Sequence, residues 1–380
     1  MSSDIVNIKY KKIACPLCDN RSYEVINNRK ISINTPKVIF KFNNFEVCCK
    51  YCNFIYINPI PTQTSLNHYY ASKSLHIGTP DYNMENRLAL IKKIHISKYK
   101  SLAEIGSNEG SFLTQCKGIF DNVFGIDFGE NKDSYSLDRI KSKTFDIIVL
   151  NHVLEHIPDL ITFLKKIRSK IKDDGKIICE VPILNKYKDN KNISLYHEHL
   201  FHFTRESLIA IFNKAGLKVE SYYNERYLSR PIGGLVIASK LKYTAHNQIT
   251  KDKFSKNLFQ KAIYDEKIVL HKQIRFIKKY LKNKNYKIGI WGANEYLEMF
   301  LYYASEEDLN RIFVFDNSIS KIGTSTGTIE KSLIIESPRE SRNIKKITHL
   351  IICAVNWDNE IRKELTSIIG EHKNVATFPF

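Results

Sequence analysis

The sequence predicts an α/β protein in which a small cysteine-stapled unit precedes two units of alternating strands and helices. Three observations lead to this prediction. Two C-x-x-C pairs lie near the N-terminus, apolar runs alternate with helical patterns from about residue 100 to 240, and a second alternation starts near residue 287. Alternating strands and helices indicate parallel sheets, and a chain of 380 residues is too long for one typical core.

Four cysteines mark the first segment, residues 1–75, as a predicted zinc-binding domain. Cys15 and Cys18 form one pair, and Cys49 and Cys52 form the other. Four thiolates at this spacing can hold one tetrahedral ion, and a small strand-rich unit often needs such a staple. A redox dithiol would need one C-x-x-C beside an α/β pattern, so structural zinc is the favoured interpretation. Because four thiolates close the coordination sphere, no catalysis is expected at this metal.

The second segment, residues 76–245, has the pattern of a doubly wound sheet. A helix is expected between residues 80 and 100, and strands are expected over 101–105, 122–127, 144–151 and 175–183. Further helices are expected over 160–171 and 205–216, and closing strands over 217–225 and 231–240. In such a sheet, ligands bind outside the carboxyl ends of the strands.

The third segment, residues 246–380, begins with a lysine-rich helical stretch over 250–283. A second α/β unit follows, with a glycine turn in "IGIWGANEY" and Asp316 after the next strand. Alone, this pattern is a weak indication of mononucleotide binding.

The net charge of +18 raises the question of a nucleic-acid partner. The lysines are scattered along the chain, which is typical of solvated helix faces, so no nucleic acid is expected as a partner. No apolar run reaches the length of about 18 residues that a membrane span needs, and the N-terminus has no apolar signal segment. We therefore expect a cytoplasmic monomer that does not bind membranes.

A glycine turn follows the first strand of the second segment, in "AEIGSNEGSF". Glu104, Gly106, Asn108 and Gly110 form an acidic-x-Gly-x-x-x-Gly arrangement, and Gly106 lets the backbone approach a ligand closely. Asp127 ends the next strand, where a carboxylate can accept both hydrogen bonds of a ribose diol. The turn has no G-x-G-x-x-G and no lysine, which argues against dinucleotide and P-loop sites.

An acidic residue before a glycine turn, with a carboxylate after the next strand, resembles the class I S-adenosylmethionine (SAM) methyltransferases. The resemblance implies that the turn holds the methionine part of the cofactor, that Asp127 holds the ribose, and that Asn151 and His152 in "FDIIVLNHVLEHI" face the methyl donor. Only 17 residues separate Asp127 from Phe145, too few for the usual helix, strand and helix. The loop that contacts adenine is expected to be truncated or rebuilt.

Three histidines surround one glutamate in "SLYHEHLFHFTRES", residues 194–207. Thr204 is a predicted helix N-cap with Ser207 three residues on, and His202 is expected to pack in the interior. As alternate residues of a strand share a face, His197 and His199 could also meet one ion with Glu198.

The whole arrangement resembles the sugar C-methyltransferases of deoxysugar biosynthesis, which act on nucleotide-linked 4-ketosugars. The motifs "CPLC", "CKYC", "EIGSNEGSF", "YHEHLFHFT", "PIGG" and "GIWGAN" carry this resemblance over almost all of the chain. It implies that Tyr196, Glu198 and His199 lie over the sugar, with His199 as the base. It also implies that a tyrosine near residues 68–82 reaches the site, and Tyr69, Tyr70 and Tyr82 are the candidates. The third segment would close over the sugar nucleotide.

The chemistry expected of this family suits the residues. A ketone acidifies the adjacent C–H, a histidine can remove that proton near neutral pH, and the resulting enolate attacks the sulfonium methyl group. Tyr196 could donate a hydrogen bond to the developing enolate oxygen. Three alternatives stay open: a methyltransferase directed to oxygen, nitrogen or phosphate of a surface-glycan precursor, a zinc-containing binding module without turnover, and a nucleic-acid methyltransferase.

Overall fold

The computed structural model describes residues 4–34, 38–72, 83–94, 97–107, 110–127, 137, 140–187, 197–241, 251–319, 321–327, 332–371 and 374–379. The chain divides into a larger compact unit, residues 5–33 and 39–263, and a smaller unit of residues 264–380 with short pieces at 1–4 and 34–38. The predicted boundaries after residues 75 and 245 stay a prediction. No helix among the described residues combines the length and apolar character needed to cross a membrane.

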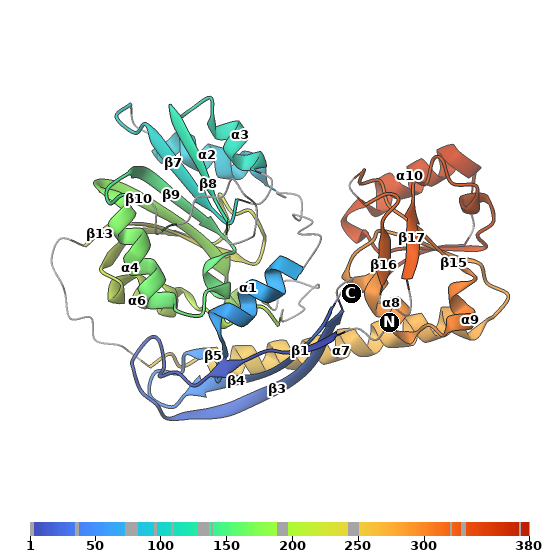
Figure 1. Cartoon of the computed structure of the whole chain (residues 1–380), viewed down its shortest axis with the longest axis horizontal. Coiled ribbons are helices and arrows are strands. Elements are labelled where there is room, and N and C mark those ends of the chain that lie inside the picture. The colour runs from blue at the N-terminus through green and yellow to red at the C-terminus, as the bar shows by residue number, and fades with distance from the viewer. Residues whose placement is uncertain are drawn as a thin grey trace. The chain divides into compact units, whose positions relative to one another are not determined.

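The first layer of the larger unit is a five-stranded sheet (Figure 1). Its path is β1 (Asp4–Asn7), β4 (Val38–Cys49), β5 (Ile55–Ile57) and β11 (Phe201–His202), and β3 (Tyr23–Asn34) pairs with β4. Two short strands, β2 (Tyr10–Lys11) and β6 (Ile60–Pro61), pair separately. In β4 the aromatic residues Phe40 and Phe42 are buried while Lys41 and Asn43 are exposed, the alternation expected of a sheet with one covered face. Helix α1 (Gln63–Ser72) covers that face through Tyr69.

The second layer is a six-stranded sheet in the order β12-β13-β10-β9-β7-β8. The strands are β7 (Ser101–Ile105), β8 (Asn122–Ile126), β9 (Phe145–Asn151), β10 (Ile171–Pro182), β12 (Leu217–Tyr223) and β13 (Gly233–Lys240). Strand β13 is antiparallel to both of its neighbours, and β7, β8, β9 and β10 run parallel. The predicted strands are confirmed. Their continuous apolar runs arise because both faces of a parallel sheet are covered.

Helices cover both faces of this sheet (Figure 1). Helices α2 (Met84–Ile94) and α3 (Ser111–Cys116) share one core with β7, β9, β10 and β13, and α4 (Leu160–Lys170) and α6 (Arg205–Lys214) pack against the strands as well. Two shorter helices, η1 (Leu154–His156) and α5 (Leu184–Tyr187), follow β9 and β10. Among the described residues the sheet ends at β8. This agrees with the short segment after Asp127, most of which lies outside the described residues.

The smaller unit contains a second six-stranded sheet, in the order β16-β17-β15-β14-β18-β19. Its strands are β14 (Ile288–Trp291), β15 (Ile312–Phe315), β16 (Ser325–Gly327), β17 (Ser332–Glu336), β18 (His349–Ile352) and β19 (Val375–Thr377). Its helices are α8 (Glu295–Tyr303), α9 (Glu306–Leu309), η2 (Asn343–Lys345), η3 (Val355–Trp357) and α10 (Asp358–Ile369). The long helix α7 (Ser255–Lys282) contributes residues to both units. The second Rossmann-like alternation is therefore present as predicted.

The glycine turn of the smaller unit packs closely against neighbouring residues of the same unit. Gly292 has a φ of 112°, and a Cβ atom there would lie 2.5 Å from the backbone nitrogen of Ala354. The Asp316 carboxylate accepts a hydrogen bond from the Ala293 N–H at 2.8 Å and pairs with Lys321 at 3.3 Å. Mononucleotide binding at this turn stays a prediction, and a ligand would share Asp316 with these partners.

Candidate functional site

The four predicted zinc ligands converge in the first layer. The Sγ atoms of Cys15 and Cys52 lie 3.6 Å apart and those of Cys18 and Cys49 lie 3.5 Å apart, and all four Sγ atoms fall within 4.8 Å of one another. A tetrahedral ion with Zn–S bonds of about 2.3 Å separates its thiolates by about 3.8 Å. The four side chains therefore fit a structural zinc ion, which stays a proposal.

Each C-x-x-C pair sits in the same kind of turn. The Asp19 N–H donates to the Cys15 carbonyl at 2.8 Å, and the Asn53 N–H donates to the Cys49 carbonyl at 2.9 Å. Asp19 and Asn53 have φ values of 60° and 61°, a left-handed conformation that Asp and Asn tolerate better than most side chains. The residue after each pair thus turns the backbone so that both thiols point to one centre.

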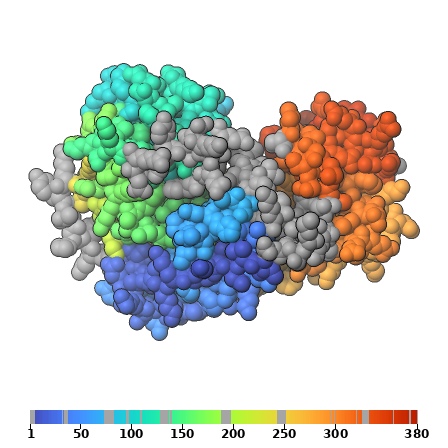
Figure 2. Space-filling view, viewed as in Figure 1, coloured from blue at the N-terminus to red at the C-terminus, as the bar shows by residue number. Residues whose placement is uncertain are grey.

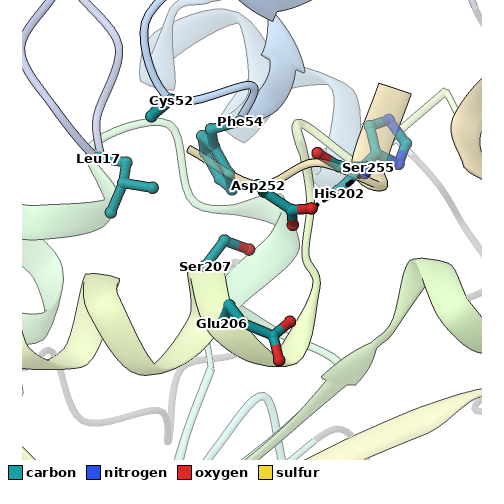
Figure 3. A pocket seen from close by; sticks show the side chains of 8 residues that line it. All are labelled: Leu17, Cys52, Phe54, His202, Glu206, Ser207, Asp252 and Ser255. Carbon is teal, nitrogen blue, oxygen red and sulfur yellow. Dashed lines mark hydrogen bonds between the residues drawn. The ribbon is translucent and has the colours of Figure 1, made fainter. Parts of the chain in front are cut away.

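The second turn is tied to the helices that follow. Asp252 donates its backbone N–H to the Cys52 carbonyl at 3.1 Å and accepts a hydrogen bond from the Thr204 hydroxyl at 2.7 Å. Figure 3 shows the adjoining cavity, of about 20 Å³, whose lining includes Cys52, Ser207 and Asp252. Such a cavity has room for about one water molecule. This cavity is a packing gap between neighbouring elements and is too small for a substrate.

At the carboxyl edge of the six-stranded sheet, the predicted glycine turn follows β7. Gly106 has a φ of 75°, and a Cβ atom there would lie 2.6 Å from Cγ2 of Val153. Gly110 has a φ of 73° and precedes α3, with open space within 4 Å of the position of a Cβ atom. Asp127 directly follows β8. Asn108 lies outside the described residues.

Glu104 and Asn151 are brought together by Arg87, which the sequence analysis did not single out. The Arg87 guanidinium, 7% exposed, lies 2.5 Å from the Glu104 carboxylate. The Asn151 side chain accepts from the same guanidinium when its amide oxygen faces Arg87. The guanidinium also stacks 3.6 Å above the centroid of the Phe112 ring. A buried cation therefore joins the ends of β7 and β9 at the predicted cofactor site.

His152, which follows Asn151, is held between two carboxylates. Its Nε2 lies 3.3 Å from Glu180 and its Nδ1 lies 3.4 Å from Glu155. Burial lowers the pKa of His152, but its contacts with Glu155 and Glu180 outweigh burial, so the net shift in pKa is upward. The structure therefore places the His152 ring between the carboxylates of Glu155 and Glu180. Contact of this ring with a cofactor stays a prediction.

Glu180 explains the glycine pair in "PIGG". Its carboxylate is completely buried at the end of β10 and accepts the backbone N–H groups of Ser229 at 2.8 Å and Arg230 at 3.0 Å. A Cβ atom at Gly233 would lie 2.4 Å from Glu180 Oε1, and one at Gly234 would lie 2.2 Å from Ile183. Both glycines are therefore needed for β13 to pack beside β10.

The histidine stretch is positioned by the first layer. Phe201 and His202 form β11, which pairs with Tyr56 and Ile55 of β5. Just before β11, the Tyr69 hydroxyl donates to the Glu198 carboxylate at 2.6 Å and lies 3.0 Å from Nε2 of His197. Tyr69 thus reaches this stretch from α1, and the Tyr70 hydroxyl lies 3.4 Å from Nδ1 of His156 in η1. Tyr82 and Tyr196 lie outside the described residues.

The His199 side chain lies against Glu155 and His156. Its ring is 9% exposed, lies edge-on to the His156 ring at 5.1 Å between centroids, and places Nε2 4.0 Å from Glu155. Burial lowers the pKa of His199 well below its ordinary value, and the neighbouring imidazoles lower it further. The alternative in which His197 and His199 share one ion is therefore not supported by the geometry.

The rest of the stretch has structural roles. His202 is 2% exposed and packs against Phe259 at 4.6 Å between centroids, and burial lowers its pKa to about 3. Thr204 caps α6 in a reciprocal capping box with Ser207. Both predictions, a packing histidine and a threonine N-cap, are confirmed.

Residues 80–222, which span most of this sheet and its glycine turn, match the family model described as a methyltransferase domain. The chain carries a methyltransferase domain. The prediction of a SAM-dependent methyltransferase is confirmed at the level of this domain, and the sheet order agrees with the predicted Rossmann-like fold.

Two curated proteins are similar to the chain. C-methyltransferase NovU of Streptomyces niveus is 24% identical over 193 residues, which cover 46% of this chain and 46% of that protein. Demethylmenaquinone methyltransferase of Lactococcus lactis is 24% identical over 160 residues, which cover 32% of this chain and 63% of that protein. The chain thus spans less than two thirds of the length of either relative. A solved structure of 1,6-didemethyltoxoflavin-N1-methyltransferase from Burkholderia thailandensis is 13% identical, with 52% of this chain and 96% of that one covered and a TM-score of 0.39.

The methyltransferase domain fits SAM at the carboxyl edge of its sheet. Strands β7, β8 and β9 are parallel neighbours, so Glu104, Asp127 and Asn151 lie at the same edge, where cofactors bind in such folds. Glu104, Asp127 and Asn151 are the residues that would hold the cofactor there.

Replacing Arg87 with methionine is expected to weaken SAM binding in the methyltransferase domain by at least about tenfold and to destabilise the fold. The substitution leaves the Glu104 carboxylate, 4% exposed, without its cation, and breaking a buried ion pair costs about 3–5 kcal/mol. Calorimetric titration and urea unfolding measure the two effects. The double variant Arg87→Met, Glu104→Gln should recover stability, and Lys93→Met, which removes a cation on the surface of the same helix, is the matched control. Unchanged SAM affinity in Arg87→Met would contradict the assignment.

Proposed function

We propose that the chain transfers the methyl group of SAM to a carbon atom of a nucleotide-linked 4-ketosugar, with His199 as the base. The observation that carries the proposal is the position of a buried imidazole beside the cofactor edge. His199 faces Glu155, and Glu155 faces His152, which directly follows Asn151 at the end of β9. The resemblance to a C-methyltransferase over 46% of the chain also supports methylation at carbon.

The state of His199 suits proton abstraction. Because burial lowers its pKa, the ring is neutral at pH 7 and has a lone pair available for a proton. Transfer of the C–H proton to the imidazole moves the bonding electron pair into the ketone, which becomes an enolate. When bound, SAM supplies an electrophilic methyl group for the enolate carbon. A positioned general base contributes about 10²- to 10⁴-fold to such a step.

Glu198 and Tyr69 have a different proposed role. Their hydrogen bond of 2.6 Å engages the Glu198 carboxylate, so we assign the pair to holding a sugar hydroxyl rather than to taking the proton. Tyr196 remains the proposed donor to the enolate oxygen. The same proposal includes a structural zinc ion in the four-cysteine site and a nucleotide-sugar partner bound by a monomer. It also includes the expectation that the chain binds neither nucleic acid nor membranes.

The test is incubation of the zinc-loaded chain with SAM and a panel of nucleotide-linked 4-ketosugars in deuterated water, followed by mass spectrometry and NMR. We expect a new carbon-bound methyl group, and deuterium at the carbon beside the ketone when SAM is replaced by S-adenosylhomocysteine. A methyl group on oxygen, nitrogen or phosphate would replace this proposal with the alternative acceptor class. SAM binding without product from any ketosugar would overturn it.

A further inference from the structure

Glu155 is a completely buried carboxylate that faces three imidazoles. It lies in η1 with no exposed surface, and neither carboxylate oxygen has a hydrogen-bond partner among the described residues. Its Oε1 lies 3.4 Å from His152, 3.9 Å from His156 and 4.0 Å from His199. An ionised carboxylate is costly to bury unless it is paired. The neighbouring imidazoles must therefore supply the protons that stabilise it.

The orientation of the His156 ring is fixed from its far side. Nδ1 of His156 lies 3.0 Å from the backbone carbonyl of Glu198, and because a carbonyl only accepts, Nδ1 carries a proton. Nε2, on the opposite edge of the ring, is the atom that faces Glu155. The His199 ring meets His156 edge-on and likewise presents Nε2 to Glu155. The Glu155 carboxylate therefore lies near Nε2 of both His156 and His199.

The other carboxylates of the site have partners elsewhere. Glu180 accepts two backbone N–H groups and contacts His152, and Glu198 accepts from Tyr69. Among the described residues, the imidazoles and charged groups near Glu155 or His199 include His152, His156, His202, Glu180 and Arg230. Burial raises the pKa of Tyr70, Tyr187 and Cys179, so these neighbours stay neutral. Among the described residues, Glu155 is thus the carboxylate that the structure places against His199.

We propose that Glu155 is the positioning residue of the proton-transfer site, an inference that rests on the proposed function. Its carboxylate draws the proton of neutral His199 to Nε2, so that Nδ1 accepts the proton of the substrate C–H. The ring then carries a proton on each nitrogen, the C–H electron pair resides on the enolate, and Glu155 stabilises the imidazolium. The separation of 4.0 Å becomes a hydrogen bond after a shift of about 1 Å or through one water, and catalytic hydrogen bonds often tighten only when substrate binds.

The direct test is the tautomer of His199, read from long-range ¹H–¹⁵N spectra of the zinc-loaded chain with ¹⁵N-labelled histidine. The His199 signals are assigned by their loss in His199→Gln. In the unmodified chain we expect the Nε2–H form. In Glu155→Gln, which keeps the side-chain volume, we expect at least half of the population to leave that form. Glu220→Gln, a matched change at a surface carboxylate paired with Lys176, should leave the tautomer as it is. An identical tautomer in Glu155→Gln would overturn the proposal.

Kinetics separate positioning from a merely structural role. We expect Glu155→Gln to lower kcat by about 100-fold with KM within about 3-fold, and Glu155→Asp to recover part of kcat. A lower melting temperature with unchanged kcat would overturn the proposal. A second bound metal ion in the unmodified chain that is lost in Glu155→Gln would overturn it too, because Glu155 would then be a metal ligand. If no ketosugar is methylated, the proposed function fails, while the tautomer still decides the role of Glu155.

Discussion

Removal of the zinc ion proposed at Cys15, Cys18, Cys49 and Cys52 is expected to release the segment 197–203 while the six-stranded sheet stays folded. This segment is anchored by β11 on β5, and the Ile57 N–H donates to the Leu200 carbonyl at 2.9 Å. Strand β5 begins three residues after Cys52. Structural zinc contributes on the order of 10 kcal/mol, as much as the whole stability of a typical domain. The first layer therefore should not keep its register without the ion.

Hydrogen exchange after treatment with a chelator checks this result without a substrate. Peptides covering 55–57 and 197–203 should lose protection by at least about 100-fold. A peptide covering β9 should change little, because the hydrophobic core around β9 contains none of the four clustered cysteines. Cys48→Ala is the matched control, since Cys48 is buried beside Cys49 but is not one of the four clustered thiols. It should keep one metal ion per chain. Full protection of 197–203 in the metal-free chain would show that the first layer keeps its register without the ion, and would contradict the prediction.

The elements of the fold were predictable because each leaves a local signal. Strands β7 and β9 and the second half of β10, residues 177–182, are buried and mostly apolar in sequence. The two cysteine pairs keep the C-x-x-C spacing in the sequence. The capping box of Thr204 and Ser207 is also local, since its two residues are three positions apart. What could be predicted was therefore whatever depends on neighbours in the chain.

The site could be predicted only in part because its key contacts join distant segments. Arg87 lies in a lysine-containing amphipathic helix and reads as part of a solvated face, yet it is buried against Glu104. Glu155 follows an apolar strand, and His199 is brought to it by the pairing of β11 with β5 and by the hydrogen bond from the Leu200 N–H to the Glu155 carbonyl at 2.8 Å. That ladder joins residues about 145 positions apart through strands of two and three residues, too short to give a periodic signal.

Replacing His199 with glutamine is expected to lower kcat by about 1,000-fold while SAM affinity stays within about 2-fold. The loss reflects removal of the proposed base, and the cofactor residues Glu104, Asp127 and Asn151 lie on the ends of other strands. Steady-state rates with a ketosugar and calorimetric titration of SAM measure the two quantities. His271→Gln, at an exposed position of α7, is the matched control and should keep full activity.

The pH profile gives an independent check on the same residue. The base works in its neutral form, which predominates above its pKa, and burial places that pKa well below the ordinary value of His199. Activity should therefore be maintained at pH 6.5, where an ordinary histidine is half protonated, and should fall only at more acidic pH. In His199→Gln this acidic limb should disappear from the residual rate. An acidic limb centred at or above pH 6.5 would show that the group titrating in the rate has an ordinary or raised pKa, and would assign proton abstraction to a group other than His199. A His199→Gln variant that keeps more than about a tenth of kcat would lead to the same conclusion, because loss of a general base lowers the rate by about 10²- to 10⁴-fold.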